Sequence, residues 1–389
     1  MTVPFDQRKL SVMQVLEPSG GGSGRHFLDL SVGLKARGHK VTAVYSPLRA
    51  EPRFIEELQS LGLDDVHAVA MQRAPGPSDL VAWNAINRIM RSGGPFDLIH
   101  AHSSKAGALT RMRLPPAAVP RIYTPHAFRT MDDSLGKAGR LVFGSIESAL
   151  GRFASDRVIC VSADERIHAR QLGIPENRLS TVVNGAAPPP NGRRKQMRAT
   201  LGLPADALVF GFIGRLSPQK APERLIDAFA RIADALPASY LLMIGSGELE
   251  TELRQRIYAA GLESRVVLRG DIPGPEAVQC FDVLVMPSRY EAMPYVMLEA
   301  AAAGKPMILA DVGGARTVVD DGDNGLIVPN TDDPSALAAA MNRLACDTAR
   351  SAFTQSADAR RERFSLSAMI DMTEAVYRDV LKERRRSGN

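Results

Sequence analysis

Two glutamates, Glu291 and Glu299, lie between an apolar run and an alanine-rich stretch. The run 282–286 has the composition of a buried strand, and 295–303 lacks helix breakers, so the pair is expected where a strand passes into a helix. Carboxylates only accept hydrogen bonds and therefore suit a ligand rich in hydroxyl groups, such as a sugar or a ribose. The alternative is structural, because glutamates near a helix start also cap the helix and interact with its dipole.

Two cations follow the strand predicted over 208–213. Arg215 and Lys220 lie in the loop before a helix that is expected to start near Pro222. A guanidinium binds phosphate through two hydrogen bonds and an ammonium adds a point charge, so the pair could hold a diphosphate at the same sheet edge as the glutamates. The alternative is that both are ordinary solvated surface charges.

A glycine-rich loop, Gly20–Gly24, follows the strand predicted over 10–16 and precedes a helical pattern and a second strand over 40–45. This β-loop-α-β unit would present backbone N–H groups of Gly21, Gly22 and Ser23 and a helix N-terminus to an anion. The spacing departs from GxGxxG, and the alternative is a tight turn that needs positive φ.

Two histidines end predicted strands of the first half. His102 ends the strand 97–102, and His126 ends the strand 121–126, where Thr124-Pro125 makes the loop rigid. Ligands of parallel sheets bind beyond the carboxyl ends of the strands, so both are site candidates. A hydrogen-bonded structural histidine is the alternative for each.

Strands and helices alternate along the whole chain, which predicts an α/β protein with parallel sheets covered on both faces. Its 389 residues exceed what one core usually supports, so two domains are expected. The breaker-rich segment 187–206 reads as a linker between a domain over 1–186 and a domain over 207–364.

Composition excludes several classes of protein. Hydrophobic residues make up 45% of the chain and charged residues 23%, as in globular proteins, and no apolar run is long enough to span a bilayer. The N-terminus resembles no signal peptide. The three cysteines, Cys160, Cys280 and Cys346, are scattered, which predicts reduced core residues of a cytoplasmic protein and no zinc site.

Basic residues are concentrated between Ser104 and Phe153, where eight of them face three acidic ones. Such a field could serve anionic lipid, a diphosphate or nucleic acid, but no aromatic nucleic-acid motif accompanies it. The helix predicted over 137–153 has two interpretations. Its apolar residues Leu141, Val142, Ile146 and Leu150 either face the core or bind a membrane surface.

Together these motifs resemble the family-4 glycosyltransferases, retaining enzymes of the GT-B fold, in which two Rossmann-like domains face each other across a cleft. The order is the family's: the glycine loop, Thr124-Pro125-His126, Gly214-Arg215-Leu216 with Pro218-Gln219-Lys220, Gly245-Ser246-Gly247, then Glu291 and Glu299. Pro294, Thr317 and Ala221 depart from frequent family residues, but none of them removes a required charge.

The resemblance implies a role for each candidate. Arg215 and Lys220 would bind the donor diphosphate, Glu299 the ribose and Glu291 the transferred sugar. Three residues of the first domain, Gly21, Gly22 and Ser23, would approach the donor, and His126 would lie near the reacting carbon. Backbone groups near Arg269 and Gly270 would contact the base. The segment 365–389 would cross back to the first domain as a helix with a basic tail.

The resemblance also implies a metal-independent reaction without a cofactor, because Arg215, Lys220 and a helix N-terminus can stabilise the leaving phosphate. The Asp321-Gly322-Asp323 motif reads as turn chemistry. The expected partners are a UDP- or GDP-sugar and a polyprenyl-diphosphate-linked glycan of exopolysaccharide or O-antigen assembly, on the inner membrane face. The alternatives are a nucleotide-sugar epimerase of the same architecture and a non-catalytic nucleotide-sugar-binding scaffold.

Overall fold

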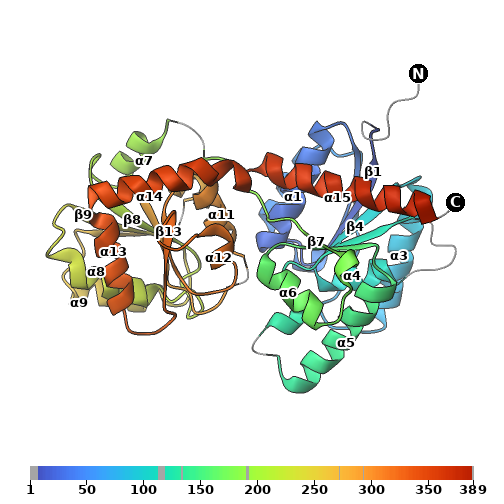
Figure 1. Ribbon diagram of the computed structural model, residues 1–389, viewed down its shortest axis with the longest axis horizontal. Coiled ribbons are helices and arrows are strands. Elements are labelled where there is room, and N and C mark those ends of the chain that lie inside the picture. Colours follow the sequence, from blue (N-terminus) through green and yellow to red (C-terminus); the bar gives the residue numbers. More distant parts are fainter. Residues whose placement is uncertain are drawn as a thin grey trace. The chain divides into compact units, whose positions relative to one another are not determined.

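The structure is a computed structural model that describes residues 8–112, 119–132, 135–189, 192–270, 272–291 and 293–387. It divides into two compact units (Figure 1). Unit 1 consists of Met1–Asn184 with Leu366–Asn389, and unit 2 of Gly185–Ser365. Each unit is built on its own parallel sheet.

The sheet of unit 1 has seven strands in the order β3-β2-β1-β4-β5-β6-β7, and every pairing is parallel. The central strand, β1, is buried along five of its six residues, as expected for a sheet with helices on both faces. The strands are β1 (Ser11–Leu16), β2 (Lys40–Tyr45), β3 (Asp65–Ala68), β4 (Leu98–His102), β5 (Arg121–Thr124), β6 (Arg157–Cys160) and β7 (Leu179–Thr181).

Helices connect these strands and cover the sheet. They are α1 (Gly21–Ala36), α2 (Pro52–Ser60), α3 (Ser78–Ser92), α4 (Ser104–Arg111), α5 (Lys137–Phe153) and α6 (Ala163–Gln171). The final helix, α15 (Leu366–Ser387), also belongs to this unit. Its Met369, Ile370, Tyr377 and Val380 share a core with residues of β1 and α1, and α15 lies beside α1 (Figure 1). Gly33 makes room on α1, because a Cβ there would come within 1.9 Å of Ile370 Cδ1.

Unit 2 repeats the same strand order with six parallel strands, β10-β9-β8-β11-β12-β13. They are β8 (Leu208–Ile213), β9 (Ser239–Ile244), β10 (Val266–Arg269), β11 (Val283–Met286), β12 (Met307–Ala310) and β13 (Gly325–Val328). The helices are α7 (Arg194–Thr200), α8 (Pro222–Ala233), α9 (Glu250–Ala259), α10 (Gly274–Ala277), α11 (Tyr295–Ala302), α12 (Ala315–Val318), α13 (Ser335–Ala345) and α14 (Asp347–Arg360). Two Rossmann-like units thus confirm the predicted fold class.

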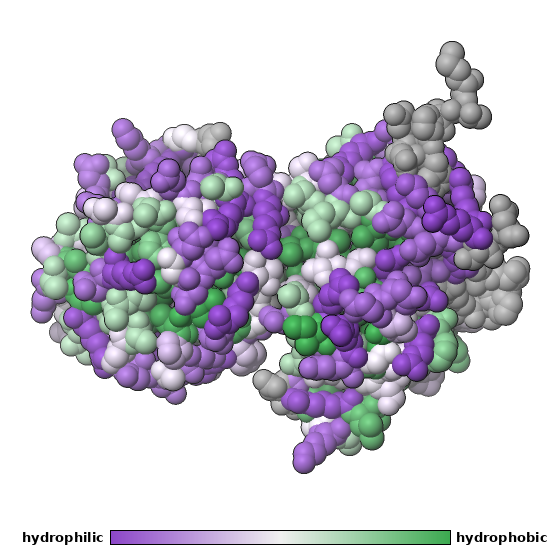
Figure 2. Space-filling view, in the orientation of Figure 1, coloured by the Kyte–Doolittle hydropathy of each residue, from purple (hydrophilic) through white to green (hydrophobic). Residues whose placement is uncertain are grey.

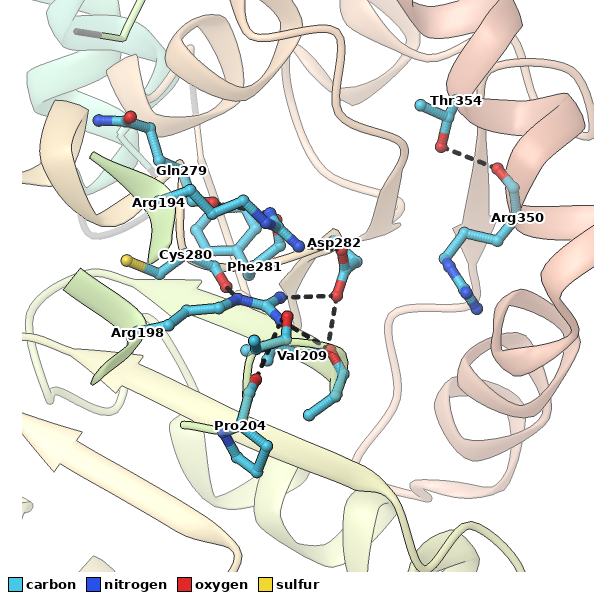
Figure 3. Close-up of polar contacts among 12 residues, drawn as sticks. Arg194, Arg198, Pro204, Val209, Gln279, Cys280, Phe281, Asp282, Arg350 and Thr354 are labelled. Carbon is cyan, nitrogen blue, oxygen red and sulfur yellow. Dashed lines mark hydrogen bonds and ion pairs between the residues drawn. The ribbon is translucent and has the colours of Figure 1, made fainter. Parts of the chain in front are cut away.

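The structure differs from the linker predicted over 187–206. Residues 194–200 form α7, which is fixed to unit 2 by two arginines (Figure 3). Arg194 and Arg198 both pair with Asp282, at 2.6 and 3.0 Å, and buried Arg198 also donates to the carbonyl oxygen of Cys280. Runs of arginine and lysine read as a solvated segment in the sequence, but here two of them neutralise a carboxylate at the base of β11.

The cysteine prediction holds for two residues and is wrong for the third. Cys160 and Cys280 are buried, whereas Cys346 is exposed. Cys346 lies at the junction of α13 and α14, where the chain turns between two helices and no core covers the side chain.

Candidate functional site

Strand register brings the predicted residues of unit 1 to one edge of its sheet. Leu16 pairs with His102, and His102 pairs with Thr124. The loops that follow β1, β4 and β5 therefore leave the sheet side by side. The order of strands reverses between β1 and β4, which is where ligands of such sheets bind.

The glycine loop passes directly into α1. Gly20 is the N-cap, and Gly21, Gly22 and Ser23 form the first helical turn. Their N–H groups point out of the helix N-terminus and suit an anion. A carboxylate already lies there, because Glu51 accepts a hydrogen bond from the Gly21 N–H at 3.1 Å. A side chain at position 20 would collide with Glu51, since its Cβ would lie 2.7 Å from Glu51 Cδ.

His126 lies in a loop of unusual backbone conformation. Both His126 and Ala127 have positive φ, 54° and 79°. Glu165 of α6 holds this loop, because its carboxylate accepts hydrogen bonds from Ala127 N at 2.7 Å and Val161 N at 2.6 Å. Burial raises the pKa of Glu165 to about 7. Sequence reasoning missed Glu165, since a glutamate in a first helical turn reads only as a dipole partner.

His102 and His126 do come together, as the sheet-edge argument predicts. Their Nδ1 and Nε2 atoms are 3.2 Å apart. A third imidazole, His26 of α1, packs against both, with ring centroids 5.3 Å from His102 and 4.6 Å from His126. His26 was not predicted, because nothing in its neighbourhood distinguishes it from a helix residue.

A cavity of about 540 Å³ opens beside His126 within unit 1. Cationic side chains dominate its polar lining: Arg49, Arg73, Lys105 and Arg129, with Glu17 as the acidic member. Arg49 pairs with Glu17, Lys105 with Asp79 and Arg129 with Asp132. Arg73 is exposed and makes no ion pair with the residues that the structure describes. The cavity therefore suits an anionic ligand.

The loops of unit 2 are joined by their backbones at the carboxyl edge of its sheet. Gly214 N donates to Ile244 O and Leu216 N to Ser246 O. A Cβ on Gly245 would lie 1.9 Å from the carbonyl oxygen of Gly214. Only a glycine permits this approach, which explains the Gly-Ser-Gly sequence after β9.

The loop after β8 is also tied to the loop after β11. Arg289 N donates to Gln219 O at 2.8 Å, and Gln219 Nε2 donates to Tyr290 O. These contacts bring Lys220 to Glu291, and their side chains form an ion pair at 2.5 Å in which both are largely buried. Sequence reasoning placed Lys220 and Glu291 at one edge but not in contact, and it missed the link through Arg289.

Arg215 contrasts with Lys220. Its side chain is exposed and makes no ion pair within the described ranges of the chain. It therefore remains available to an anion that reaches the switch point between β8 and β11.

Glu299 projects from α11, which begins at Tyr295 after Pro294 as the N-cap. A Cβ on Gly274 would lie 3.0 Å from Glu299 Oε2, so this glycine gives the carboxylate room. Arg269 ends β10, and its carbonyl oxygen accepts from Gly245 N. The adjoining Gly270 is near Gly245 and Ser246. The predicted residues of unit 2 thus come from neighbouring loops.

The Asp-x-Asp motif is a turn, as interpreted from the sequence. Gly322 has φ 83°, Asp321 accepts from Ile327 N, and Asp323 pairs with Arg360. A cavity of about 760 Å³ in unit 2 lies away from the candidate residues. It is lined by Leu208, Ser239 and Asp282, where strands begin, and by the arginines of Figure 3.

Two Rossmann-like units, each with its own parallel sheet and with glycine-containing loops beyond the carboxyl ends of its strands, match the GT-B class of glycosyltransferase. Family models described as "Glycosyl transferases group 1" and "Glycosyltransferase Family 4" match residues 193–360 and 20–188. The chain belongs to the family-4 glycosyltransferases. It is therefore a glycosyltransferase, of a family in which retention is typical, rather than an epimerase or a silent scaffold.

Relatives of known activity differ in their acceptors. A D-inositol 3-phosphate glycosyltransferase from Acidothermus cellulolyticus is 30% identical, and the match covers 98% of this chain and 92% of that one. The UDP-Gal:alpha-D-GlcNAc-diphosphoundecaprenol alpha-1,3-galactosyltransferase from Escherichia coli is 32% identical over 61% of this chain and 63% of its own. The structure of HepE from Anabaena in complex with UDP and glucose has a TM-score of 0.77 at 22% identity, covering 94% and 99% of the two chains.

Proposed function

We propose that this enzyme transfers one sugar from a UDP- or GDP-sugar to a glycan carried on a polyprenyl diphosphate, in exopolysaccharide or O-antigen assembly. The observation that carries the proposal is the cationic cavity of unit 1 beside His126. Both named relatives act on acceptors that contain phosphate, which supports an anionic acceptor.

The proposed roles of the donor-binding residues in unit 2 follow from their charges. Arg215 is the exposed cation and is the first to meet the diphosphate. Lys220 is neutralised by Glu291, so a diphosphate that attracts Lys220 would release the Glu291 carboxylate for the hydroxyl groups of the sugar. Glu299 would accept from the ribose. With these groups stabilising the leaving phosphate, the transfer itself would need no metal ion.

The choice of a lipid-linked acceptor rests on α5. This helix packs on unit 1 through its glycine face, since Gly144, Glu147 and Gly151 are its buried residues. A Cβ on Gly151 would lie 2.7 Å from Ile174, so the close approach depends on that glycine. The interpretation in which the apolar residues of this helix face the core is therefore wrong for Leu141, Val142 and Ile146, which are exposed. Phe153, the last residue of the helix, is exposed as well.

This exposed apolar face carries basic residues and no exposed acidic one. Lys137, Arg140 and Arg152 are exposed on α5, and its acidic residue, Glu147, is buried against Arg111. Hydrophobic atoms among hydrophilic ones are visible at the lower end of unit 1, where α5 lies (Figures 1 and 2). Phe143 of α5 also lines the cationic cavity, so the helix connects that cavity to a lipid-compatible surface.

The structure leaves fewer basic residues available at the surface between Ser104 and Phe153 than the sequence suggests. Arg111 and Arg121 are buried, Lys105 pairs with Asp79, and Arg113 lies outside the described residues. Membrane binding would therefore depend on α5 itself. None of the helices in the described part of the chain is long and apolar enough to cross a bilayer.

Donor binding is tested by thermal stability with UDP, GDP, ADP and dTDP. A ligand at about 100 times its dissociation constant adds about 2.7 kcal/mol to the free energy of unfolding. We expect UDP or GDP to stabilise the protein and Arg215→Ala to abolish the shift, whereas Arg254→Ala, on the exposed face of α9, retains it. Stabilisation that persists in Arg215→Ala would remove this residue from the donor site.

The acceptor class is tested by comparing transfer to a polyprenyl-diphosphate glycan with transfer to an inositol phosphate, because the relatives include a transferase for each. Transfer to the lipid-linked acceptor is expected, and Arg73→Ala should raise its KM without altering slow hydrolysis of the donor. Transfer to the inositol phosphate instead would contradict the proposed acceptor but would not contradict the proposed donor site.

Membrane binding is tested by co-sedimentation with vesicles that contain anionic lipid. Lys137→Glu with Arg140→Glu, and separately Leu141→Ser with Val142→Ser, are expected to reduce binding. Tyr258→Ser is the control, since this residue of unit 2 is 74% exposed. Unchanged sedimentation of both double variants would discard the membrane role of α5.

A further inference from the structure

Three histidines from distant parts of the sequence converge in unit 1. His26 comes from α1, His102 from the end of β4 and His126 from the loop after β5. One ring nitrogen from each lies within 4.8 Å of the others. Among the described residues, this is the one group of three or more histidine, cysteine or acidic side chains with metal-binding proximity.

Hydrogen bonds determine which nitrogen of His102 is free to bind a ligand. Ser31 Oγ donates to Phe27 O at 2.7 Å and therefore accepts from Gln14 Nε2, at 2.9 Å. The Gln14 carbonyl oxygen then faces His102 Nε2, at 3.1 Å, and accepts its proton. His102 Nδ1 consequently carries a lone pair and accepts the hydrogen bond from His126 Nε2, so a metal ion bound here would take the place of that proton and leave His126 protonated on Nδ1. A carbonyl that accepts from the distal nitrogen is the usual arrangement around a metal-bound histidine.

His26 supplies the unsatisfied group. Its side chain is buried, and neither ring nitrogen makes a hydrogen bond of normal geometry with the residues that the structure describes. The Oδ1 atom of buried Asn184 also lacks a hydrogen bond of normal geometry, and its side-chain interaction with His26 opposes the lowering of the His26 pKa by burial. A buried polar group without a well-formed hydrogen bond destabilises the fold, and a bound ligand would remove that penalty.

The protonation state of the cluster also suits a cation. Burial lowers the pKa of His26 to about 4 and holds the pKa of His102 and His126 well below the usual value. All three imidazoles are therefore neutral near pH 7 and offer lone pairs.

We propose that His26, His102 and His126 bind a divalent transition-metal ion, zinc by preference. Imidazole ligands suit zinc, and three of them with a fourth position for water make a known type of zinc site. Ligand nitrogens of a tetrahedral zinc ion are about 3.4 Å apart, because each Zn–N bond is about 2.0–2.1 Å. The 3.2 Å separation of His102 and His126 is close to this value, and the His26 nitrogen lies within 4.8 Å of both.

Such an ion would fasten α1 and the loop of His126 to the end of β4. It would act in unit 1 and not at the diphosphate, so it does not conflict with a transfer step that needs no metal. His126 Nε2 would then be a ligand, which leaves Nδ1 of the same ring for contacts in the cationic cavity.

The test is the metal content of the full chain, purified with a tag that contains no histidine. We expect about one zinc per chain by elemental analysis, and about none in His26→Gln or His126→Gln. His168→Gln is the control, since His168 is bonded to Thr130 outside the cluster and should leave the zinc in place. Fluorescence of Trp83 and circular dichroism verify that each variant is folded.

A second measurement covers the case in which the zinc is lost during purification. Cobalt(II) added to chelator-treated protein should give the visible absorption of a tetrahedral site, and His26→Gln should abolish it. Wild-type protein that holds no zinc and gives no such absorption would overturn the proposal, in favour of a buried water between the rings. Retention of zinc in either cluster variant would overturn the three-ligand site.

Discussion

The two units share one strand order but carry different chemistry at their switch points. All seven histidines of the chain lie in the first 184 residues, so unit 2 contains none. At the edge of unit 1, His26, His102 and His126 are kept neutral by burial. At the edge of unit 2, Lys220 and Glu291 keep opposite charges in an ion pair.

The difference shows how one fold can divide the work of a transfer reaction. A leaving diphosphate needs positive charge and carboxylates for its sugar and ribose, and unit 2 presents both. In the proposed function, unit 1 would orient the acceptor, and the buried Glu165 carboxylate, which accepts from Ala127 N, would hold the loop of His126. The predictions below test this division.

The largest effect is expected at the ion pair of unit 2. Lys220→Ala and Glu291→Ala should each lower kcat by about 10²–10³-fold, the usual cost of losing one group that stabilises developing charge. Steady-state transfer assays measure the loss, and circular dichroism should show that both variants fold. Arg254→Ala is the control. Near wild-type turnover in either variant would remove that residue from the mechanism and weaken the contrast between the units.

The neutral cluster of unit 1 predicts a pH dependence. The pKa of His26 is lowered from 6.5 to about 4, so the unfolded chain takes up a proton below pH 6.5 that the folded chain resists. The stabilisation is complete above pH 6.5 and is lost as the pH falls toward 4, by about 3 kcal/mol in total. His26→Gln should lack this loss.

The measurement is urea unfolding of wild type and His26→Gln between pH 7.5 and 4.5, with a chelator present. Fluorescence of Trp83, the one tryptophan of the chain, follows unit 1. The free energies of the two proteins should converge as the pH falls. Parallel curves would show that His26 gains no proton on unfolding, against the neutral state assigned to it.

Gly245 tests the close packing of the loops in unit 2. Its φ is 151°, and a Cβ would lie 1.9 Å from the backbone oxygen of Gly214, which cannot move aside as a side chain can. Gly245→Ala should lower the free energy of unfolding of unit 2 by about 1–3 kcal/mol, measured by circular dichroism. Gly261→Ala is the control, since that position also has positive φ but nothing lies within 4 Å. Equal effects of the two variants would attribute the cost to φ alone.

Most of the strands were predictable, because short apolar runs alternate with helical patterns along the chain. The strand β13 (Gly325–Val328) was missed, since its four residues follow the Asp-Gly-Asp-Asn turn over 321–324 and show no alternation. The orientation of α5 could not be read from its pattern either. Helix amphipathicity predicts that Leu141 and Val142 are buried, but Gly144 and Gly151 allow a closer approach on the opposite face.

The residues of the candidate site were also predictable only in part. Glycines, Arg215, Lys220 and Glu291 were predictable, because each follows a strand and the carboxyl ends of parallel strands meet. The histidine cluster was only partly predictable. His102 and His126 end strands, whereas His26 reaches them from inside α1, a contact that depends on how the helix packs.

An effect no larger than that of Gly245→Ala is expected at a histidine whose two ring nitrogens both have partners. His100, on β4 next to the cluster, contacts Tyr377 OH at 2.7 Å and Thr124 Oγ1 at 2.8 Å through its two nitrogens. Tyr377→Phe removes the contact from α15 and leaves one buried nitrogen of His100 without a partner, at a cost of about 1–3 kcal/mol. Urea unfolding followed by Trp83 fluorescence should show a lower midpoint, whereas the exposed Tyr258→Phe should not. If Tyr377→Phe is neutral, buried imidazoles of unit 1 tolerate a missing partner, and the unpaired nitrogens of His26 lose their significance as a sign of a bound ion.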